Sequence, residues 1–293
     1  MSNIKAAIRR LPVLGGLAVN VLARIRAVRD QKTLALLSNT SYSQAETIKQ
    51  VILQVGNDLP SVDRDWIVRI EEQRNSLLRR HDPLVDGSLG ESGLYDGDKT
   101  ISMACMVSKP PEPALVLYLL VRAIKPKTVI ELGTNVGISS SFIAAALQQN
   151  GENGRLVTLE SSPYRLKVAR EVHRNLGLDN VTYVQGLFAD TLDDTLSRMG
   201  SVDLAFIDGH HLYKPTLDYY EQIFPAAAPD GVFVFDDIRW SEGMVRAWSE
   251  IKADQRIGLA VDLDHVGICV KAAPDAPKRY VFPALRTVIR NAA

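Results

Sequence analysis

Acidic side chains follow two apolar runs in the second half of the sequence. Asp208 comes directly after residues 204–207, and Asp236 and Asp237 come directly after residues 232–235. An acid that is removed from water needs a partner that offsets the cost of desolvation, and a divalent cation such as Mg²⁺ prefers oxygen ligands. We therefore interpret the three aspartates as candidate metal ligands. The alternative is that one acid of the pair caps the following helix while Asp208 holds a loop amide.

Two adjacent histidines, His210 and His211, follow Asp208 in the segment Asp-Gly-His-His-Leu-Tyr. Imidazole titrates near neutral pH and can accept a proton from a reacting hydroxyl. Only one of two adjacent side chains is expected to point into a site. For either histidine, the alternative is a loop residue that is hydrogen-bonded to the backbone.

A second group of residues lies about 70 residues earlier, in the segment from Glu131 to Ser139, and includes Gly133 and Gly137. Glycines let the backbone turn tightly and approach a ligand. Glu160 ends the next apolar run, where an acid can accept hydrogen bonds from both hydroxyls of a ribose. The alternative for Glu160 is a charge at the N-terminus of the following helix. Together these residues predict a nucleoside cofactor site.

Other site classes lack their motifs. The spacing Gly-x-x-x-Gly differs from the dinucleotide fingerprint Gly-x-Gly-x-x-Gly, no Lys-Ser/Thr pair marks a P-loop, and no serine elbow of the form Gly-x-Ser-x-Gly is present.

These residues must be positioned by a regular alternation of elements. Five apolar runs read as strands buried on both faces, and helical stretches separate them, which predicts a parallel sheet with right-handed crossovers. A helix near residues 242–253 precedes two further strands that form an antiparallel hairpin. The expected strands span residues 128–132, 156–160, 181–185, 204–207, 232–235, 257–263 and 266–271. The fold class is thus α/β, with a doubly wound, seven-stranded, mostly parallel sheet and a terminal antiparallel hairpin. Ligands of such sheets bind outside the carboxyl ends of the strands, where the candidate residues lie.

The pattern Glu-Leu-Gly-x-x-x-Gly-x-Ser, followed by an acid at the end of the second strand, resembles the first two motifs of class I S-adenosylmethionine-dependent methyltransferases. The branch that it resembles contains catechol O-methyltransferase and the bacterial sugar and macrolide O-methyltransferases. The resemblance covers residues 113–272, with Asn135 in place of the commoner third glycine. It implies that the first turn contacts the methionine part of the cofactor, that Glu160 holds the ribose, and that the turn after strand three lies along the adenine. The implied cofactor-binding residues are Glu131, Gly133, Asn135, Gly137, Ser139, Glu160, Gly186, Leu187 and Asp208.

The resemblance also extends to the reaction. Asp208, Asp236 and Asp237 match the acidic ligands of metal-dependent members, and the pattern Asp-Gly-x-His-x-Tyr makes His211 the expected base, with His210 as the alternative. The expected function is O-methylation of a hydroxyl on a small molecule or glycan, with S-adenosylmethionine as the methyl donor and Mg²⁺ or another divalent metal assisting. The competing interpretations are a metal-independent methyltransferase and a non-catalytic cofactor-binding or membrane-adaptor protein.

The first 112 residues carry no such resemblance, and we interpret them as a helical extension. Helices are expected over 34–58 and 62–81, with Asp63 as a candidate cap of the second. The glycine-rich stretch 82–99 and the prolines of 108–113 form a candidate lid over the acceptor site.

Both termini are basic. Residues 1–32 carry seven lysines and arginines against one acid, around an apolar run too short to span a membrane. Two interpretations remain open, a segment in peripheral contact with a membrane or a helix packed on the protein's own body. Residues 273–293 form a basic C-terminal tail.

The composition places further bounds on function. The chain has 293 residues with 34 lysines and arginines and 34 aspartates and glutamates, so no overall basic field favours nucleic acid as a partner. Two cysteines, Cys105 and Cys269, fit a reducing compartment better than a disulfide scaffold. We expect a cytoplasmic protein, either membrane-associated or free, and a homo-oligomer is compatible with the sequence.

Overall fold

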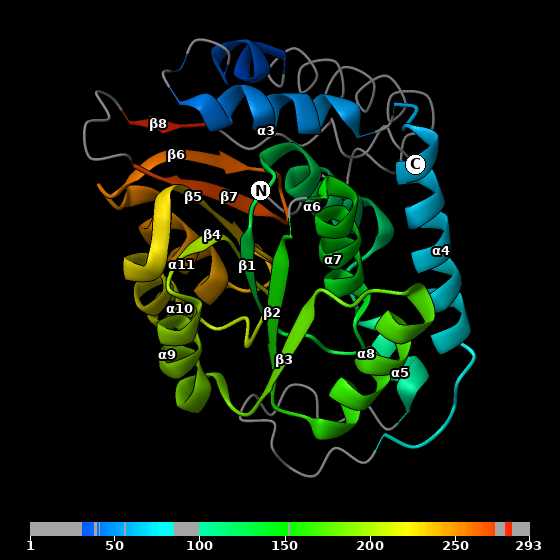
Figure 1. The fold of residues 1–293 in the computed structure, drawn as a ribbon. Coiled ribbons are helices and arrows are strands. Elements are labelled where there is room, and N and C mark those ends of the chain that lie inside the picture. The colour runs from blue at the N-terminus through cyan, green and yellow to red at the C-terminus, as the bar shows by residue number, and fades with distance from the viewer. Residues whose placement is uncertain are drawn as a thin grey trace, which may run out of the picture.

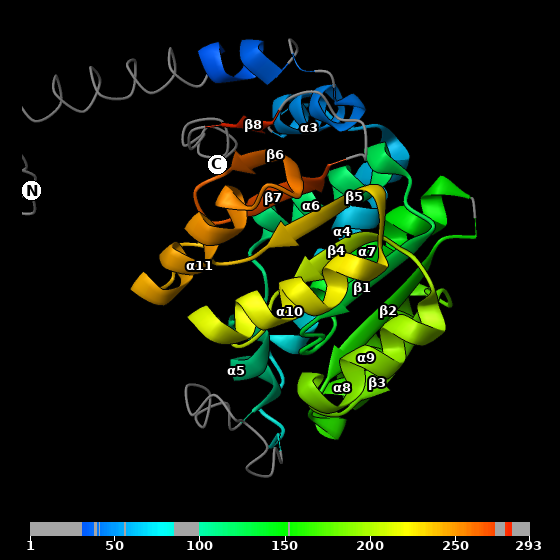
Figure 2. The ribbon, with the colours of Figure 1, turned by 90° about the vertical axis from the view of Figure 1, so that its left-hand side faces the viewer.

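The computed structural model describes residues 31–37, 40, 42–55, 57–84, 100–151, 153–272 and 279–282. A single eight-stranded sheet runs through this part of the chain, and helices cover both of its faces (Figures 1 and 2). The strand order is β3-β2-β1-β4-β5-β7-β6-β8. The strands are β1 (Thr128–Leu132), β2 (Arg155–Glu160), β3 (Val181–Gln185), β4 (Val202–Ile207), β5 (Ala227–Phe235), β6 (Ile257–Asp262), β7 (Gly267–Lys271) and β8 (Tyr280–Val281).

The pairing of the strands confirms the predicted topology. Strands β1 to β5 pair in parallel, and β7 pairs antiparallel with both β5 and β6. The order reverses between β1 and β4, because the chain runs outward to β2 from one and to β5 from the other. The crevice at this reversal is the expected ligand site of an open α/β sheet.

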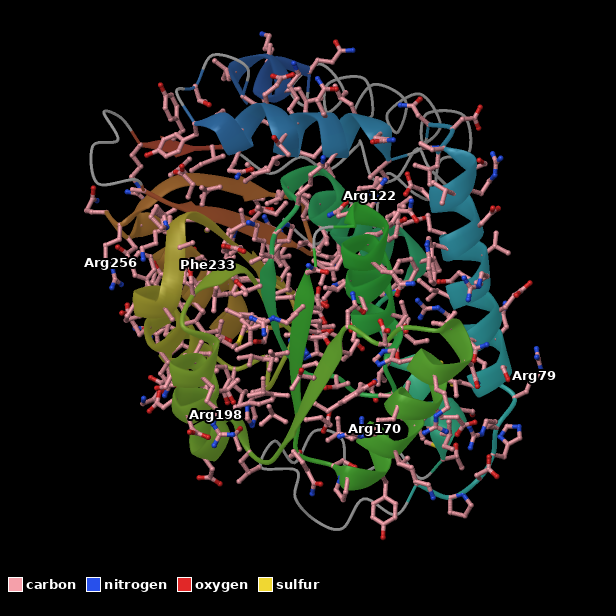
Figure 3. The ribbon with its side chains drawn as sticks, in the orientation of Figure 1. Arg79, Arg122, Arg170, Arg198, Phe233 and Arg256 are labelled. Atoms are coloured by element: carbon pink, nitrogen blue, oxygen red, sulfur yellow. The ribbon has the colours of Figure 1, made fainter. Side chains whose placement is uncertain are left out.

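Two helical layers bury separate apolar cores against the sheet. One face carries α6 (Pro111–Ile124), α7 (Ile138–Asn150) and α8 (Pro163–Leu176). Behind this layer, α3 (Ser43–Gln54) packs on α6 and α4 (Ser61–Leu77) packs on α7. The other face carries α9 (Phe188–Met199), α10 (Tyr213–Ala226) and α11 (Glu242–Ala253). The short helix α5 (Ile101–Met106) precedes α6. Figure 3 shows Phe233 inside the molecule and Arg79, Arg198 and Arg256 toward its edges.

Local sequence explains where several of these helices begin. The Ser162 hydroxyl accepts a hydrogen bond from the backbone N–H of Arg165, and Pro163 occupies the first turn of α8, as is typical of a helix start. The Ser241 hydroxyl caps α11 in the same way.

The structure corrects four expectations. The predicted helix over 34–58 is interrupted, because Tyr42 has an extended backbone and its ring packs on Gly258 of β6. Asp63 does not cap α4; its buried carboxylate accepts hydrogen bonds from the Tyr118 hydroxyl and from Arg122 of α6.

Strand β3 is an edge strand and is only half-buried. Finally, residues 280–281 of the predicted tail pair in parallel with β6 as an eighth strand.

Several predicted features lie outside the described residues. These are the basic segment 1–30, the part of the candidate lid between 85 and 99, and most of the C-terminal tail. Pro83 and Thr100, which flank the lid segment, pair in an antiparallel bridge. Within the described ranges, no helix is long and apolar enough to cross a membrane. Cys105 and Cys269 are both buried free thiols.

Candidate active site

The turn after β1 is shaped by a close approach between main chains. Gly133 has φ of 104°, and a Cβ atom there would overlap the carbonyl oxygen of Asp208 at the end of β4. The backbone N–H groups of Gly133 and Thr134 both donate to the carbonyl oxygen of Leu159 in β2. Only glycine combines this φ with this packing, so the turn is held against the ends of both neighbouring strands.

The second glycine of the turn serves the packing of two helices. Gly137 caps α7 with φ of 89°, and a Cβ atom there would meet Ala169 and His173 of α8. The sequence suggested that both glycines approach a ligand. In the structure, the space beside each of them is filled by the protein itself.

Glu160 joins this turn to the start of α8. Its Oε2 accepts a hydrogen bond of 2.9 Å from the backbone N–H of Asn135, and its Oε1 accepts one of 3.1 Å from that of Ser162. A carboxylate offers about four acceptor positions, so positions remain for a ribose diol. The residue therefore fits the predicted contact with the cofactor's ribose.

A second acid, Glu131 of β1, is fully buried beneath the turn. Its Oε2 accepts a hydrogen bond of 2.6 Å from the Thr158 hydroxyl, whereas its Oε1 has no hydrogen-bond partner. Burial raises the pKa of Glu131 to about 8, although the hydroxyls of Thr158 and the buried Ser139 favour the charged form. A group with this pKa is largely protonated at neutral pH, so the carboxyl beneath the turn carries little charge there.

The turn after β3 lies between the end of β2 and the loop after β4. Gly186 has φ of 147°, and its N–H donates to the carbonyl oxygen of Glu160. Leu187 is the N-cap residue of α9, and the ring of Phe188 lies edge-on to the rings of His210 and Tyr219. The predicted adenine turn therefore contacts the loop that carries the histidines.

The three predicted aspartates lie at the ends of β4 and β5, and the structure adds a lysine to them. Lys109, in the connection between α5 and α6, forms an ion pair with Asp236 in which only 3% and 6% of the two side chains are exposed. The same Oδ1 of Asp236 accepts a hydrogen bond from the N–H of Asp237. Sequence reasoning missed Lys109, because nothing in its spacing relates it to acids about a hundred residues later.

The charges in this cluster depend on one another. Burial lowers the pKa of Lys109, while Asp208 and Asp237 act in the opposite direction. Burial also raises the pKa of Asp208, against the opposing effects of Lys109 and His211. Ionised lysine and ionised aspartates therefore stabilise each other in a poorly hydrated site.

The two histidines have different surroundings. His211 points toward Asp208 and Trp240. Its Nε2 lies 3.4 Å from Oδ1 of Asp208, and the centroid of its ring lies 6.5 Å from that of Trp240. His210 turns toward α10, where its Nδ1 lies 2.5 Å from the Tyr219 hydroxyl and its ring stacks on that residue. Of the two, His211 is thus the one that faces the aspartates.

The predicted metal ligands are brought together but are not arranged around an ion. Among the residues that the structure describes, no group of three or more histidine, cysteine, aspartate or glutamate side chains could hold a metal. Lys109 is instead the partner of Asp236. The arrangement therefore does not fit a divalent ion as it stands.

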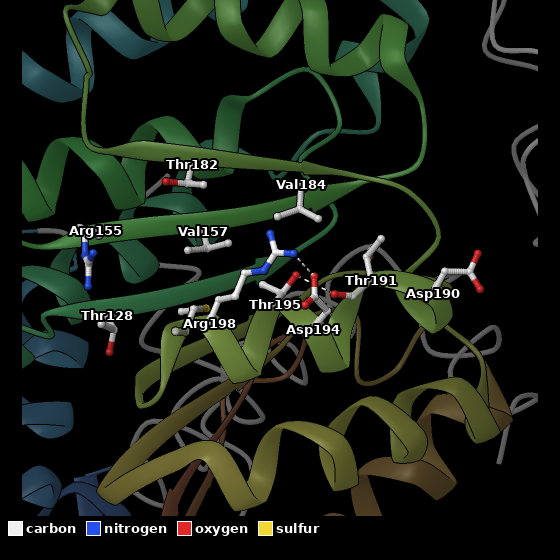
Figure 4. A pocket seen from close by; sticks show the side chains of 11 residues that line it. Thr128, Arg155, Val157, Thr182, Val184, Asp190, Thr191, Asp194, Thr195 and Arg198 are labelled. Carbon is white, nitrogen blue, oxygen red and sulfur yellow. Dashed lines mark hydrogen bonds and ion pairs between the residues drawn. The ribbon is translucent and has the colours of Figure 1, made fainter.

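A cavity of about 300 Å³ lies elsewhere, between the sheet and α9 (Figure 4). It is lined by residues of β1, β2, β3 and α9, including Val157, Thr182, Val184 and Arg198. None of the predicted site residues lines it. The cavity is therefore separate from the predicted site at the strand ends.

Comparison with known proteins agrees with this geometry. Residues 130–238 match the family described as a methyltransferase domain. The chain is 36% identical over 166 residues to a catechol O-methyltransferase of Mycobacterium tuberculosis, covering 53% of this chain and 72% of that protein. It is 28% identical over 170 residues to a catechol O-methyltransferase of Niastella koreensis, covering 56% of this chain and 75% of that protein.

A solved structure shares the fold. The O-methyltransferase TomG from Streptomyces achromogenes, in complex with SAM, matches with a TM-score of 0.50 at 21% identity, over 57% of this chain and 82% of that one. The turn of residues 133–137 after β1 (the glycine turn), Glu160 and the order of the strands agree with these likenesses. Together they identify the chain as a member of the class I S-adenosylmethionine-dependent O-methyltransferases.

Proposed function

We propose that this enzyme methylates a hydroxyl group of a small molecule or glycan, and that the acceptor lies beside His211 at the carboxyl ends of β4 and β5. The observation that carries this proposal is the orientation of His211, whose Nε2 lies 3.4 Å from Asp208 at the edge of the crevice. A base that is positioned by an acid is what a hydroxyl acceptor requires.

The transfer is an in-line displacement. The acceptor oxygen forms a bond to the methyl carbon while the bond from that carbon to the sulfonium sulfur breaks, and S-adenosylhomocysteine leaves as a neutral thioether. His211 takes the proton that the hydroxyl loses. Asp208, which faces the same imidazole, stabilises the imidazolium that forms.

The side chains at the mouth of the crevice favour an acceptor with an apolar face. Trp240 is 61% exposed and lies beside the ring of His211, and Leu212 is 41% exposed. Exposed apolar side chains gathered at a site are typical of ligand contacts. The names of the two relatives are consistent with a flat aromatic acceptor such as a catechol.

Metal assistance is the second candidate. The convergence of Asp208, Asp236 and Asp237 favours it, because three acids at one edge of a sheet resemble an oxygen-ligand set. A bound Mg²⁺ would stabilise the acceptor oxygen as it loses its proton. The ion pair between Lys109 and Asp236 argues against this candidate.

The test compares two adjacent substitutions. Transfer of a labelled methyl group from S-adenosylmethionine is measured across a panel of phenols, catechols and sugars. His211→Gln is expected to lower kcat by roughly 10²–10⁴-fold, the usual contribution of a general base. His210→Gln is the matched control and is expected to retain most of the activity. Equal losses in both variants, or turnover on no hydroxyl while a nitrogen or carbon acceptor reacts, would contradict the proposal.

A further inference from the structure

The feature that the proposed function leaves unexplained is the lysine among the acids. Lys109 is the one buried lysine in the described part of the chain, and it forms an ion pair with Asp236. Asp237 follows Asp236 directly, and the backbone N–H of Asp236 donates to the carbonyl oxygen of Ile207, the residue before Asp208. An ammonium group therefore lies among the three acids in which the sequence predicts a divalent ion.

Local structure fixes this lysine in place. It immediately precedes Pro110, and a residue before proline is restricted to extended conformations. Pro110 is the N-cap residue of α6, so the rigid start of that helix follows Lys109 directly.

The segment before the lysine is also anchored. The Asn135 side-chain amide donates a hydrogen bond of 2.9 Å to the carbonyl oxygen of Ala104 and one of 3.3 Å to the Ser108 hydroxyl. The chain that carries Lys109 is thus held between α6 and the glycine turn.

A divalent ion would have to displace this group. The ammonium would then lose its partner Asp236 while its side chain remains nearly inaccessible to water, and an unpaired buried charge is strongly destabilising. The acids, in turn, already have one cation that reduces their mutual repulsion. Both effects disfavour a metal as long as the lysine is present.

We propose that the Lys109 ammonium is a built-in cation that takes the place of a divalent metal among Asp208, Asp236 and Asp237. Lys109 balances the charge of the aspartates and keeps Asp208 available to His211. This inference rests on the proposed function, because it states that the proposed methyl transfer takes place in a site without a metal ion. Lys109 is a positioning residue in this scheme and need not touch the acceptor.

Binding of Mn²⁺ tests the proposal without any acceptor. The full chain is stripped with a chelator and titrated with Mn²⁺, and the free ion is followed by electron paramagnetic resonance. We expect no saturable site in the wild-type enzyme. Lys109→Met removes the ammonium and is expected to create one saturable Mn²⁺ site, with an affinity at least about tenfold above any residual binding by the wild-type enzyme, a change that corresponds to about 1.4 kcal/mol.

Matched variants separate this effect from a general disturbance. Lys271→Met removes a lysine whose Nζ donates to the carbonyl oxygens of Phe224 and Ala227, away from the acids, and is expected to bind no Mn²⁺. Adding Asp236→Asn to Lys109→Met is expected to abolish the new site. If Lys109→Met does not fold, Lys109→Gln offers a neutral side chain that can still donate to Asp236, and the same gain is expected.

Two outcomes would overturn the proposal. One is a tight Mn²⁺ site in the wild-type enzyme that the lysine variants leave unchanged, because a metal would then bind beside the lysine. The other is the absence of Mn²⁺ binding in folded Lys109→Met and Lys109→Gln, because the acids would then be no metal site. Neither result depends on the acceptor, so failure of the hydroxyl proposal remains a separate finding.

Discussion

The histidine that supports the glycine turn should control the acid stability of this enzyme. His173 of α8 is 1% exposed, and its Nε2 lies 3.1 Å from both the carbonyl oxygen of Gly137 and the Ser140 hydroxyl. A carbonyl oxygen can only accept, so we assign the ring proton to Nε2. Its Nδ1 then accepts from the Tyr183 hydroxyl at 2.6 Å. The neutral ring is thus fully hydrogen-bonded, whereas protonation would place a charge in a buried site and force the Tyr183 hydroxyl to accept where it now donates.

The magnitude follows from the shift in pKa. Burial lowers the pKa of His173 from 6.5 to about 4. Above pH 6.5 the residue is neutral in both states and has no effect on the pH dependence. Between pH 6.5 and about 4 the unfolded chain binds a proton that the folded chain does not, so stability falls by about 1.4 kcal/mol per pH unit, or about 3 kcal/mol in total. Below this range both states are protonated and the loss is complete.

Urea unfolding from pH 7.5 to 4, followed by tryptophan fluorescence, measures this effect. His173→Gln keeps an amide donor for Gly137 and loses the bond to Tyr183, so it is expected to cost about 1 kcal/mol at pH 7.5. Its stability should then fall less steeply with acid, so the difference from wild type should vanish near about pH 5.8 and be clearly reversed at pH 4.5. His81→Gln replaces an exposed histidine and is the control. An unchanged slope in His173→Gln would refute the assignment of a buried neutral imidazole.

Three further substitutions probe other parts of the structure. Gly133→Ala places a methyl group on the carbonyl oxygen of Asp208 at a positive φ, so a loss of at least about 2 kcal/mol in urea unfolding is expected, with weaker S-adenosylhomocysteine binding by calorimetry; unchanged stability would mean that the turn relaxes freely. Asp63→Ala removes the carboxylate that accepts from the Tyr118 hydroxyl and the Arg122 guanidinium, and it should lower the free energy of unfolding by about 3 kcal/mol. A loss below about 1 kcal/mol would show that these hydrogen bonds between α4 and α6 contribute little to stability. Trp240→Ala should raise KM for the acceptor about tenfold, corresponding to about 1.4 kcal/mol, and leave KM for the methyl donor unchanged; an effect on the donor alone would place the indole at the cofactor instead.

The sequence predicted the sheet well because buried strands and crossover helices leave strong local patterns. The bounds of β1 agree with the apolar run 128–132, and the hairpin of β6 and β7 was expected at its observed place. The partial exposure of β3 was not predictable from its residues alone, because an edge position depends on which strands pair with one another. Strand β8 has only two residues and depends on its pairing with β6 for its existence.

The candidate site was predicted in part for a similar reason. Glu160 ends β2, and Asp208 and Asp236 directly follow β4 and β5, so the geometry of a parallel sheet brings them to one edge. Lys109 precedes the sheet and reaches this edge only through the packing of α5 and α6. The distinction between His210 and His211 depends on the positive φ angles of both residues and on the Tyr219 ring, which no spacing in the sequence specifies.

The Asn135 amide has a consequence for engineering. One side chain joins the turn after β1 to the connection between α5 and α6. The oxygen of the same side-chain amide also accepts a hydrogen bond from Arg165 of α8. The connection between α5 and α6 therefore cannot be exchanged for that of a homologue as an independent module. A graft that brings a different partner to Asn135 would alter the floor of the cofactor site as well as the charge beside Asp236, and transplants of acceptor specificity should move the two segments together.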